Sequence, residues 1–63
     1  MSKIKQVRIS KNLTQEKLAR MMDITLAYYS QVEREVAQPS RSFMQKFKKI
    51  FPEISIDEMF FNQ

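Results

Sequence analysis

The side chains most able to do chemistry in this 63-residue chain are its eleven lysines and arginines, which all lie within residues 1–49. That region holds only four acids and has a formal charge of +7, whereas residues 50–63 hold three acids, no base and a charge of −3. The acids are Glu16, Asp23, Glu33, Glu35, Glu53, Asp57 and Glu58. A basic body favours a polyanion such as nucleic acid as partner, with the acidic end turned away from it. A basic domain whose charges only keep it in solution is the alternative.

Enzyme chemistry has few candidate groups here. The chain has no cysteine and no histidine, so disulfides, the usual zinc sites, thiol nucleophiles and imidazole bases are excluded. Its carboxylates form no pair that combines a plausible pocket with a nucleophile or a metal-ligand set. We therefore predict that the protein is not an enzyme and uses no cofactor, metal or evident small-molecule ligand. Because no apolar run approaches the roughly 20 residues that span a bilayer, and residues 1–5 lack a signal-peptide pattern, we expect a cytoplasmic protein.

Helix signals recur along the whole chain, and strand signals are absent. Side chains that can cap a helix N-terminus precede the last four helical patterns, at Thr14, Thr25, Ser40 and Ser55. The predicted helices cover residues of about 2–11, 14–22, 25–34, 40–51 and 55–60. They predict one all-α domain over residues 1–63, a compact bundle of five short helices. The expected core consists of Leu18, Met22, Tyr29, Val32, Phe43, Met44, Phe47, Ile50 and Phe51.

The helices predicted over residues 14–22 and 25–34 are separated by a turn of only two or three residues. A turn this short is typical of the helix-turn-helix arrangement, which presents its second helix to the major groove of DNA. The spacing alone is a weak indication, since many small helical bundles contain such a pair.

The chain resembles the Cro/repressor (XRE-type) helix-turn-helix family from residue 4 to about residue 60. The resemblance is carried by Thr-Gln-Glu-Lys-Leu-Ala at residues 14–19, Val-Glu-Arg at residues 32–34 and Pro-Ser at residues 39–40. It implies a small transcriptional regulator of a phage or prokaryote that binds double-stranded DNA sequence-specifically, with the helix over 25–34 in the major groove. It also implies a homodimer on a two-fold-symmetric operator, associated with the nucleoid when bound, that blocks or recruits the polymerase by occupancy.

The resemblance also assigns roles to individual residues. Base contacts are expected from the outward side of the recognition helix, at Leu26, Ala27, Tyr28 and Gln31. Phosphate contacts are expected from Thr14, Gln15, Arg20, Thr25, Arg34, Gln38 and Arg41. Arg8 and Glu33 match a family pair that ties the first helix to the third through a partly buried, structural ion pair. Of the base-contacting residues, Gln31 has the amide that suits adenine, whereas Leu26 and Ala27 are limited to packing against thymine methyl groups.

Three helix ends depart from the family pattern, which commonly has glycine where this chain has Asn12, Asp23 and Glu35. Asparagine and aspartate accept a positive φ reasonably well, but glutamate does so poorly. We therefore expect the joint after Arg34 either to extend the recognition helix or to carry about 1 kcal/mol of strain.

Some of these assignments leave an alternative open. Tyr28 either faces outward or joins Tyr29 in the core, and Leu26 serves either thymine or a protein partner. A protein-interaction module on a repressor-like fold, without DNA binding, is the alternative function. The lysines at 46, 48 and 49 are expected to form a solvated face, and Arg41 is expected near the DNA backbone or minor groove.

The C-terminal cluster Met59, Phe60 and Phe61 either closes the core or forms a dimer interface. Successive side chains of a helix point about 100° apart, so the three cannot all face inward. The charges of Asp57 and Glu58 favour a surface away from DNA. We therefore predict that this cluster builds the dimer.

Overall fold

A computed structural model describes residues 2–61 and the side chains of residues 2–59. The elements are α1 (Lys3–Ser10), α2 (Gln15–Met21), α3 (Leu26–Glu33), α4 (Arg41–Ile50) and a π-helical turn, η1 (Asp57–Phe61), with no strand in the described range. The all-α prediction is confirmed. The first four predicted helices were one residue too long at each end because they included the capping residues. The last predicted helix forms a single π-helical turn instead of an α-helix.

Side-chain hydroxyls begin all four α-helices. Thr14 accepts from the amide of Lys17 at 3.0 Å, and Thr25 accepts from the amide of Tyr28 at 3.1 Å. Ser40 and Ser2 cap α4 and α1 in the same way, at 3.0 and 3.2 Å. Each bond satisfies one of the amides that an α-helix leaves without an internal partner, typically for about 1 kcal/mol. The cap at Ser2 was missed because the sequence prediction placed Ser2 inside the first helix.

Three residues in the left-handed region turn the chain after α1, α2 and α3. The φ angles of Asn12, Asp23 and Glu35 are 58°, 57° and 65°. The helix α3 ends at Glu33 and is not extended, so Glu35 takes the strained alternative of the two expected from the sequence. A residue with a Cβ pays roughly 1–2 kcal/mol in this conformation, and glutamate has no short polar side chain to offset it.

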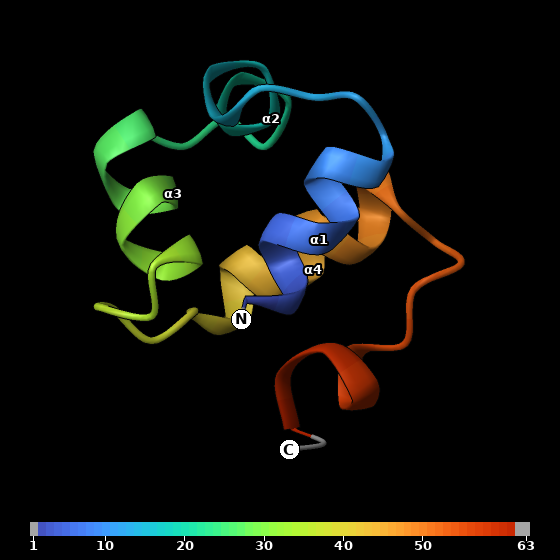
Figure 1. Ribbon diagram of the computed structural model, residues 1–63. Coiled ribbons are helices and arrows are strands. Elements are labelled where there is room, and N and C mark those ends of the chain that lie inside the picture. The colour runs from blue at the N-terminus through green and yellow to red at the C-terminus, as the bar shows by residue number, and fades with distance from the viewer. Residues whose placement is uncertain (1, 62–63) are drawn as a thin grey trace.

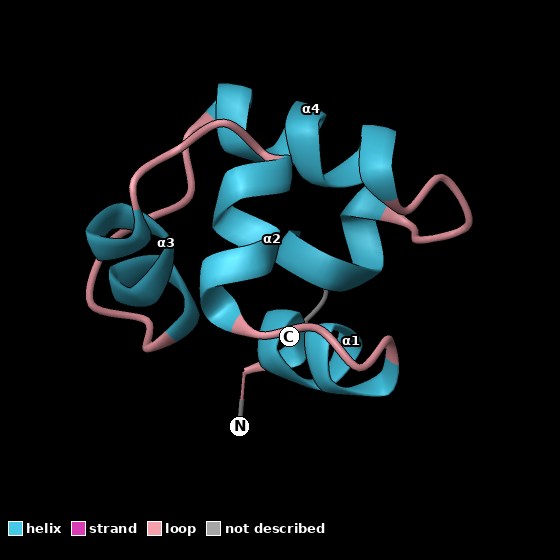
Figure 2. Cartoon of the chain, turned by 90° about the horizontal axis from the view of Figure 1, so that it is seen from above, coloured by secondary structure: helices cyan, strands magenta, loops and turns pink. Residues whose placement is uncertain are grey.

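The helices surround a core in which aromatic rings form a continuous row. Figure 1 shows α3 at one edge of the molecule and the loop after α4 at the opposite edge, and Figures 1 and 2 together show α2 lying over α1 and α4. Tyr29, Phe43, Phe47 and Phe51 follow one another with ring centroids 6.2, 6.2 and 5.0 Å apart. The buried hydrophobic residues are Ile4, Leu18, Ala19, Met22, Tyr29, Val32, Phe43, Phe47 and Phe51. Two residues expected in the core, Met44 and Ile50, are only half-buried, because they flank the α4 stripe instead of lying at its centre.

Candidate nucleic-acid interface

The helices α2 and α3 lie against each other and are joined by the turn over residues 22–25. Backbone hydrogen bonds close this turn from Asp23 to Arg20 at 3.1 Å and from Ile24 to Ala19 at 3.0 Å. The turn ends at Thr25, whose hydroxyl caps α3. Because both helix starts are fixed by caps and the turn is fixed by backbone bonds, α3 is held at a set angle on α2.

The helix α3 has one buried and one exposed side. Tyr29, Val32 and Glu33 are buried, whereas Ala27 and Gln31 are exposed on the opposite side. Leu26 lies at the flank nearest α2 and is 43% exposed. The exposed side therefore carries two residues of the predicted base-reading set at its centre and a third at its edge.

Tyr28 falls between the two alternatives that the sequence left open. Its side chain is half-buried, and its ring packs edge-on against Phe43 with centroids 5.9 Å apart. Its hydroxyl accepts a hydrogen bond from the amide of Ser40 at 3.1 Å. Tyr28 thus joins α3 to the start of α4, next to the exposed Arg41.

A polar network centred on Glu33 joins α1, α2 and α3. Arg8 Nε lies 2.9 Å from Glu33 Oε2, and Arg8 Nη2 lies 3.1 Å from Oε1. The Tyr29 hydroxyl donates to Oε2 at 2.6 Å, and the Gln15 amide nitrogen donates to Oε1 at 2.8 Å. Arg8 Nη1 also donates to the carbonyl of Leu13 at 2.8 Å. The expected ion pair between Arg8 and Glu33 is present, and it is part of a larger network.

The hydrogen bonds of this network hold each of its ionisable groups in one protonation state. Burial disfavours the Glu33 carboxylate, but hydrogen bonds from Arg8, Tyr29 and Gln15 outweigh burial and hold its pKa below the ordinary value. The hydrogen bond to Glu33 raises the pKa of Arg8. Burial, reinforced by the hydrogen bond to Glu33, raises the pKa of Tyr29 well above that of a free tyrosine, so its hydroxyl stays a neutral donor.

Gln15 makes a hydrogen bond within the protein that the sequence did not predict. Its amide nitrogen, predicted to reach a phosphate, already donates to Glu33. Only the second hydrogen on that nitrogen is then left for a phosphate oxygen, together with the backbone amides at the start of α2. Sequence reasoning missed this bond because it depends on how α2 crosses α3. The Tyr29–Glu33 bond could have been found, since residues four apart share a helix face.

The other predicted phosphate-contacting residues are exposed: Thr14, Arg20, Thr25, Arg34, Gln38 and Arg41. The two threonines accept their capping bonds through oxygen, so each hydroxyl proton is left to donate. Arg34 Nε donates back along α3 to the carbonyl of Ser30 at 3.4 Å. Arg20 lies on α2 and Thr14 caps it, Thr25 and Arg34 lie at the two ends of α3, and Gln38 and Arg41 lie in the loop before α4 and at its start.

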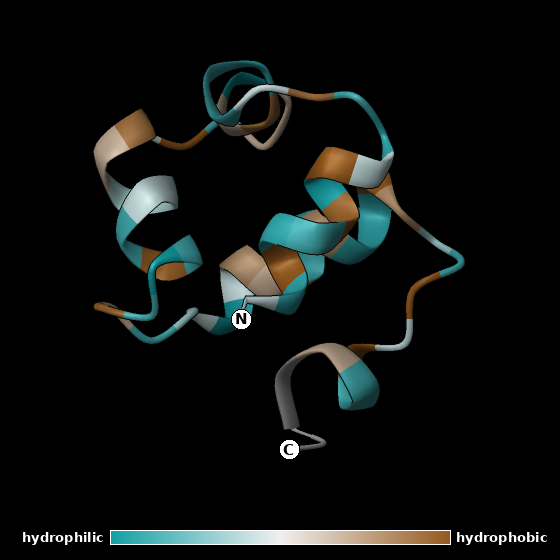
Figure 3. Ribbon diagram, in the orientation of Figure 1, coloured by the Kyte–Doolittle hydropathy of each residue, from teal (hydrophilic) through white to brown (hydrophobic). Residues whose placement is uncertain are grey.

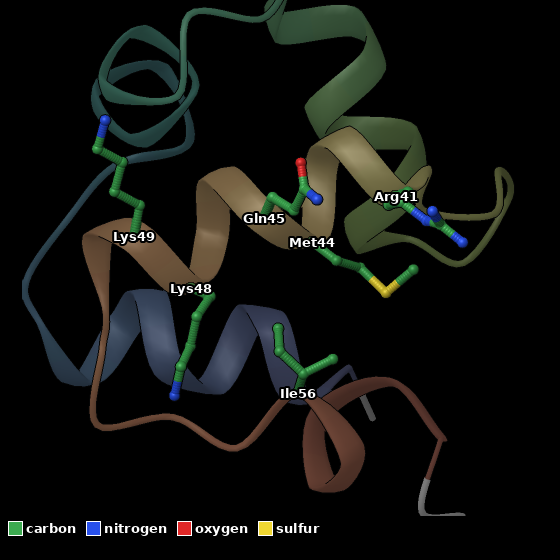
Figure 4. Close-up of a pocket in the computed structure, with 6 residues that line it drawn as sticks. All are labelled: Arg41, Met44, Gln45, Lys48, Lys49 and Ile56. Carbon is green, nitrogen blue, oxygen red and sulfur yellow. The ribbon is translucent and has the colours of Figure 1, made fainter.

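On α4, away from α3, lies a surface hollow of about 640 Å³ (Figure 4). It is lined by Arg41, Met44, Gln45, Lys48, Lys49 and Ile56. Met44 and Ile56 supply its apolar sides, and its charged lining residues within the described range are all cations. Lys48 turns toward the chain after α4 and donates to the carbonyls of Pro52 and Ile54 at 2.7 and 2.6 Å. The prediction of a solvated lysine face is therefore wrong for Lys48.

Lysines also fix the C-terminal segment to α1. Lys3 donates to the carbonyl of Glu58 at 2.9 Å, and Lys11 lies 3.0 Å from Glu53. Met59 is half-buried against the core, whereas the side chains of Phe60 and Phe61 lie outside the described residues. The structure therefore gives a position for one member of the predicted dimer cluster.

Between residues 2 and 61, no three acidic side chains gather in a way that could hold a metal ion. None of the helices described is long and apolar enough to cross a membrane.

A model of the helix-turn-helix family matches residues 4–59, which is most of the chain. The chain belongs to this family. This helix-turn-helix protein thus has the fold that its resemblance to Cro/repressor (XRE-type) proteins implied, and it is one of a family of DNA-binding regulators rather than of enzymes. Comparison with curated proteins and with solved structures gives no match.

Proposed function

We propose that this helix-turn-helix protein regulates transcription by binding specific sites in double-stranded DNA, with α3 in the major groove. The observation that carries the proposal is the division of α3 into a buried side and an exposed side. Tyr29 and Val32 hold the helix on the core, and Ala27 and Gln31 face outward. A helix mounted in this way on a second helix is the arrangement that helix-turn-helix proteins insert into the groove.

Phosphate contacts set the position of the protein, and α3 reads the bases. The exposed arginines that would contact phosphates are Arg20 on α2, Arg34 at the end of α3 and Arg41 at the start of α4. Gln31 has the amide that pairs with N6 and N7 of adenine. The Glu33 network fixes α3 relative to α1 and α2, so that these groups meet the DNA in one orientation.

We further propose that the protein acts as a homodimer on a two-fold-symmetric operator. The hollow beside Met44 and Ile56 joins a cationic rim to apolar sides, and the C-terminal segment that follows it is acidic and apolar. The charges of the two surfaces are complementary, which favours their contact between two copies. Two recognition helices would then reach successive major grooves, about 34 Å apart.

A protein-interaction module is the second candidate function. The observation that favours it is apolar exposure near α3, where Leu26 and Val36 are 43% and 69% exposed. Apolar surface of this kind also serves protein partners. The two candidates differ in how strongly they bind DNA of arbitrary sequence.

The test is the salt dependence of binding to a nonspecific duplex, followed by fluorescence anisotropy. DNA binding predicts a linear fall of log K with log salt, with a slope of about −0.9 for each phosphate contact. Arg20→Ala and Arg34→Ala should each make the slope shallower by about one contact. Lys11→Ala is the matched control, because Lys11, directly after α1, is already paired with Glu53. A wild-type affinity too weak to measure at low salt would favour the interaction module.

A further inference from the structure

The chain after α4 forms a strap, residues 52–59, that runs back toward the beginning of α1 (Figure 1). Three lysines outside the strap bind it: Lys48 on α4, Lys11 directly after α1, and Lys3 at the start of α1. Lys48 donates to two carbonyls at the beginning of the strap, and Lys3 donates to a carbonyl near its end. Lys11 pairs with the side chain of Glu53 between them. The strap is therefore held along its whole length by cations.

Apolar packing holds the strap much less firmly. None of the side chains between residues 52 and 59 is buried, and Ile54 and Met59 are half-buried against the core. Figure 3 shows hydrophobic and hydrophilic residues alternating along it. A hollow lies on each side of the strap, the one of about 640 Å³ between Ile56 and α4, and a second of about 370 Å³ between the strap and α1. A segment with few buried apolar contacts opens locally while the rest of the fold stays intact.

The contacts that hold the strap are sensitive to other ions. The strap lies in the acidic end of the chain, where residues 50–63 have a charge of −3, whereas residues 1–49 have a charge of +7. The side chains of Lys11 and Glu53 are 44% and 55% exposed, so salt screens their attraction. A polyanion binds lysines through the same charges, so it competes with the strap for all three of them.

We propose that the strap is an autoinhibitory contact, which keeps Lys3, Lys11 and Lys48 from binding a polyanion while it is closed and opens when salt or a polyanion takes these lysines. The helices α1 to α4 stay folded on opening, because the aromatic row and the Glu33 network lie outside residues 52–59. The closed strap lowers affinity for DNA of arbitrary sequence, and this consequence, unlike the opening itself, rests on the proposed function.

Amide hydrogen exchange, followed residue by residue by NMR, measures the opening. The amides of Ile54 and Met59 report on the strap, since they donate to the carbonyls of Phe51 and Ser55. The amide of Met22, a buried residue at the end of α2, reports on unfolding of the whole domain. Protection of the two strap amides should be at least about tenfold lower than that of Met22. It should fall further when salt is raised from about 50 to about 500 mM, because screening weakens the lysine contacts.

Heparin is the polyanion for the second measurement, because it binds cations without needing a DNA site. A ligand that binds the folded protein ordinarily slows exchange. Heparin should instead speed exchange at Ile54 and Met59, and it should leave exchange at Met22 unchanged or slower. Opposite effects on the strap and on the helices distinguish opening of the strap from general destabilisation.

Protein variants assign the effect to the lysines. Lys48→Met should speed exchange of the strap amides about tenfold or more, because it removes two hydrogen bonds from a charged donor. Lys49→Met is the matched control, since it removes one charge from the same helix at an exposed residue that does not bind the strap within the described range. Glu53→Gln should speed exchange by a smaller factor, because it removes one exposed ion pair, and Asp57→Asn should have no effect.

Strap amides that are protected as strongly as the amide of Met22 would overturn the proposal, since the strap would then open only with the whole domain. Equal effects of Lys48→Met and Lys49→Met, or exchange at the strap that heparin does not speed, would also overturn it. Opening by heparin in a protein that binds no nonspecific duplex would remove the proposed function and leave the strap mechanism standing.

Discussion

The hydroxyl of Tyr29 donates a 2.6 Å hydrogen bond to Oε2 of Glu33, one turn further along α3. The same oxygen receives Arg8 Nε, so a core aromatic residue and a cation of α1 share one carboxylate atom. Tyr29 also lies in the aromatic row of the core. This residue therefore joins the apolar packing of α3 to the polar network that fixes its orientation.

Tyr29→Phe should lower the free energy of unfolding by about 1.5–3 kcal/mol, because it removes a buried hydrogen bond to a charged group and keeps the ring. Tyr28→Phe is the matched control. It removes an exposed bond to the amide of Ser40 and should cost about 0.5–1.5 kcal/mol. Urea unfolding followed by circular dichroism measures both. A smaller loss for Tyr29→Phe than for Tyr28→Phe would contradict the network.

Arg8→Ala should cost about 3 kcal/mol or more at neutral pH, because it leaves the Glu33 carboxylate buried without its cation. Stability should also depend on Glu33 in acid. Its pKa is lowered in the fold, so the unfolded chain binds the proton more readily, and stability falls as the pH drops through about 4.3 and below.

Glu33→Gln should start less stable than wild type at pH 7 and lose less on acidification. Glu53→Gln is the control, since Glu53 is exposed and paired only at the surface. It should keep most of the wild-type acid dependence. Thermal melts between pH 7 and pH 3 make the comparison, and identical profiles for wild type and Glu33→Gln would show that this carboxylate does not govern the acid response.

Glu35→Gly should raise the free energy of unfolding by about 1 kcal/mol, because glycine adopts the φ of 65° without a Cβ clash. Asn12→Gly should gain less, since asparagine already tolerates this region. Chemical denaturation of the two variants is the measurement. A loss of stability in Glu35→Gly would mean that the Glu35 side chain contributes more than its strain costs.

Removal of residues 60–63, or Phe61→Ser, should give a folded monomer that binds its operator much more weakly, because the proposed dimer surface is lost. Val36→Ser, in the loop after α3, is the control and should leave the dimer intact. Sedimentation at micromolar concentration reports the oligomeric state, with circular dichroism to check folding. A truncated protein that is still dimeric would place the interface elsewhere. An unfolded product would support the alternative in which this cluster completes the core.

The interactions that the sequence predicted directly are local, whereas those that it missed join residues far apart in the chain or in separate elements. The caps at Thr14, Thr25 and Ser40 act within one turn, so residue type and helical period were enough to find them. The Arg8–Glu33 pair spans 25 residues and was expected only through family resemblance. The hydrogen bond from Gln15 and the anchoring of the chain after α4 by Lys48 depend on how separate elements meet. The local sequence pattern does not indicate how separate elements pack against each other.

The end of α3 is a second feature that could not be predicted from the sequence alone. The sequence identified Glu35 as an unusual residue for a helix end but allowed two outcomes. The loop settles the choice, because the amides of Val36 and Ala37 turn back to the carbonyl of Gln31. Those two bonds require the left-handed turn, and they stabilise it against the strain of the glutamate.

Reading of bases by α3 is the central claim, and the affinity of wild type and Gln31→Ala for two duplexes tests it most directly. One duplex is the best site selected from a random pool, and the other is the same composition in scrambled order. Wild type should prefer the selected site, and Gln31→Ala should lose about 1–3 kcal/mol on that site while binding the scrambled duplex as wild type does. Equal affinity of wild type for the two duplexes, or an equal loss on both in the variant, would contradict the account.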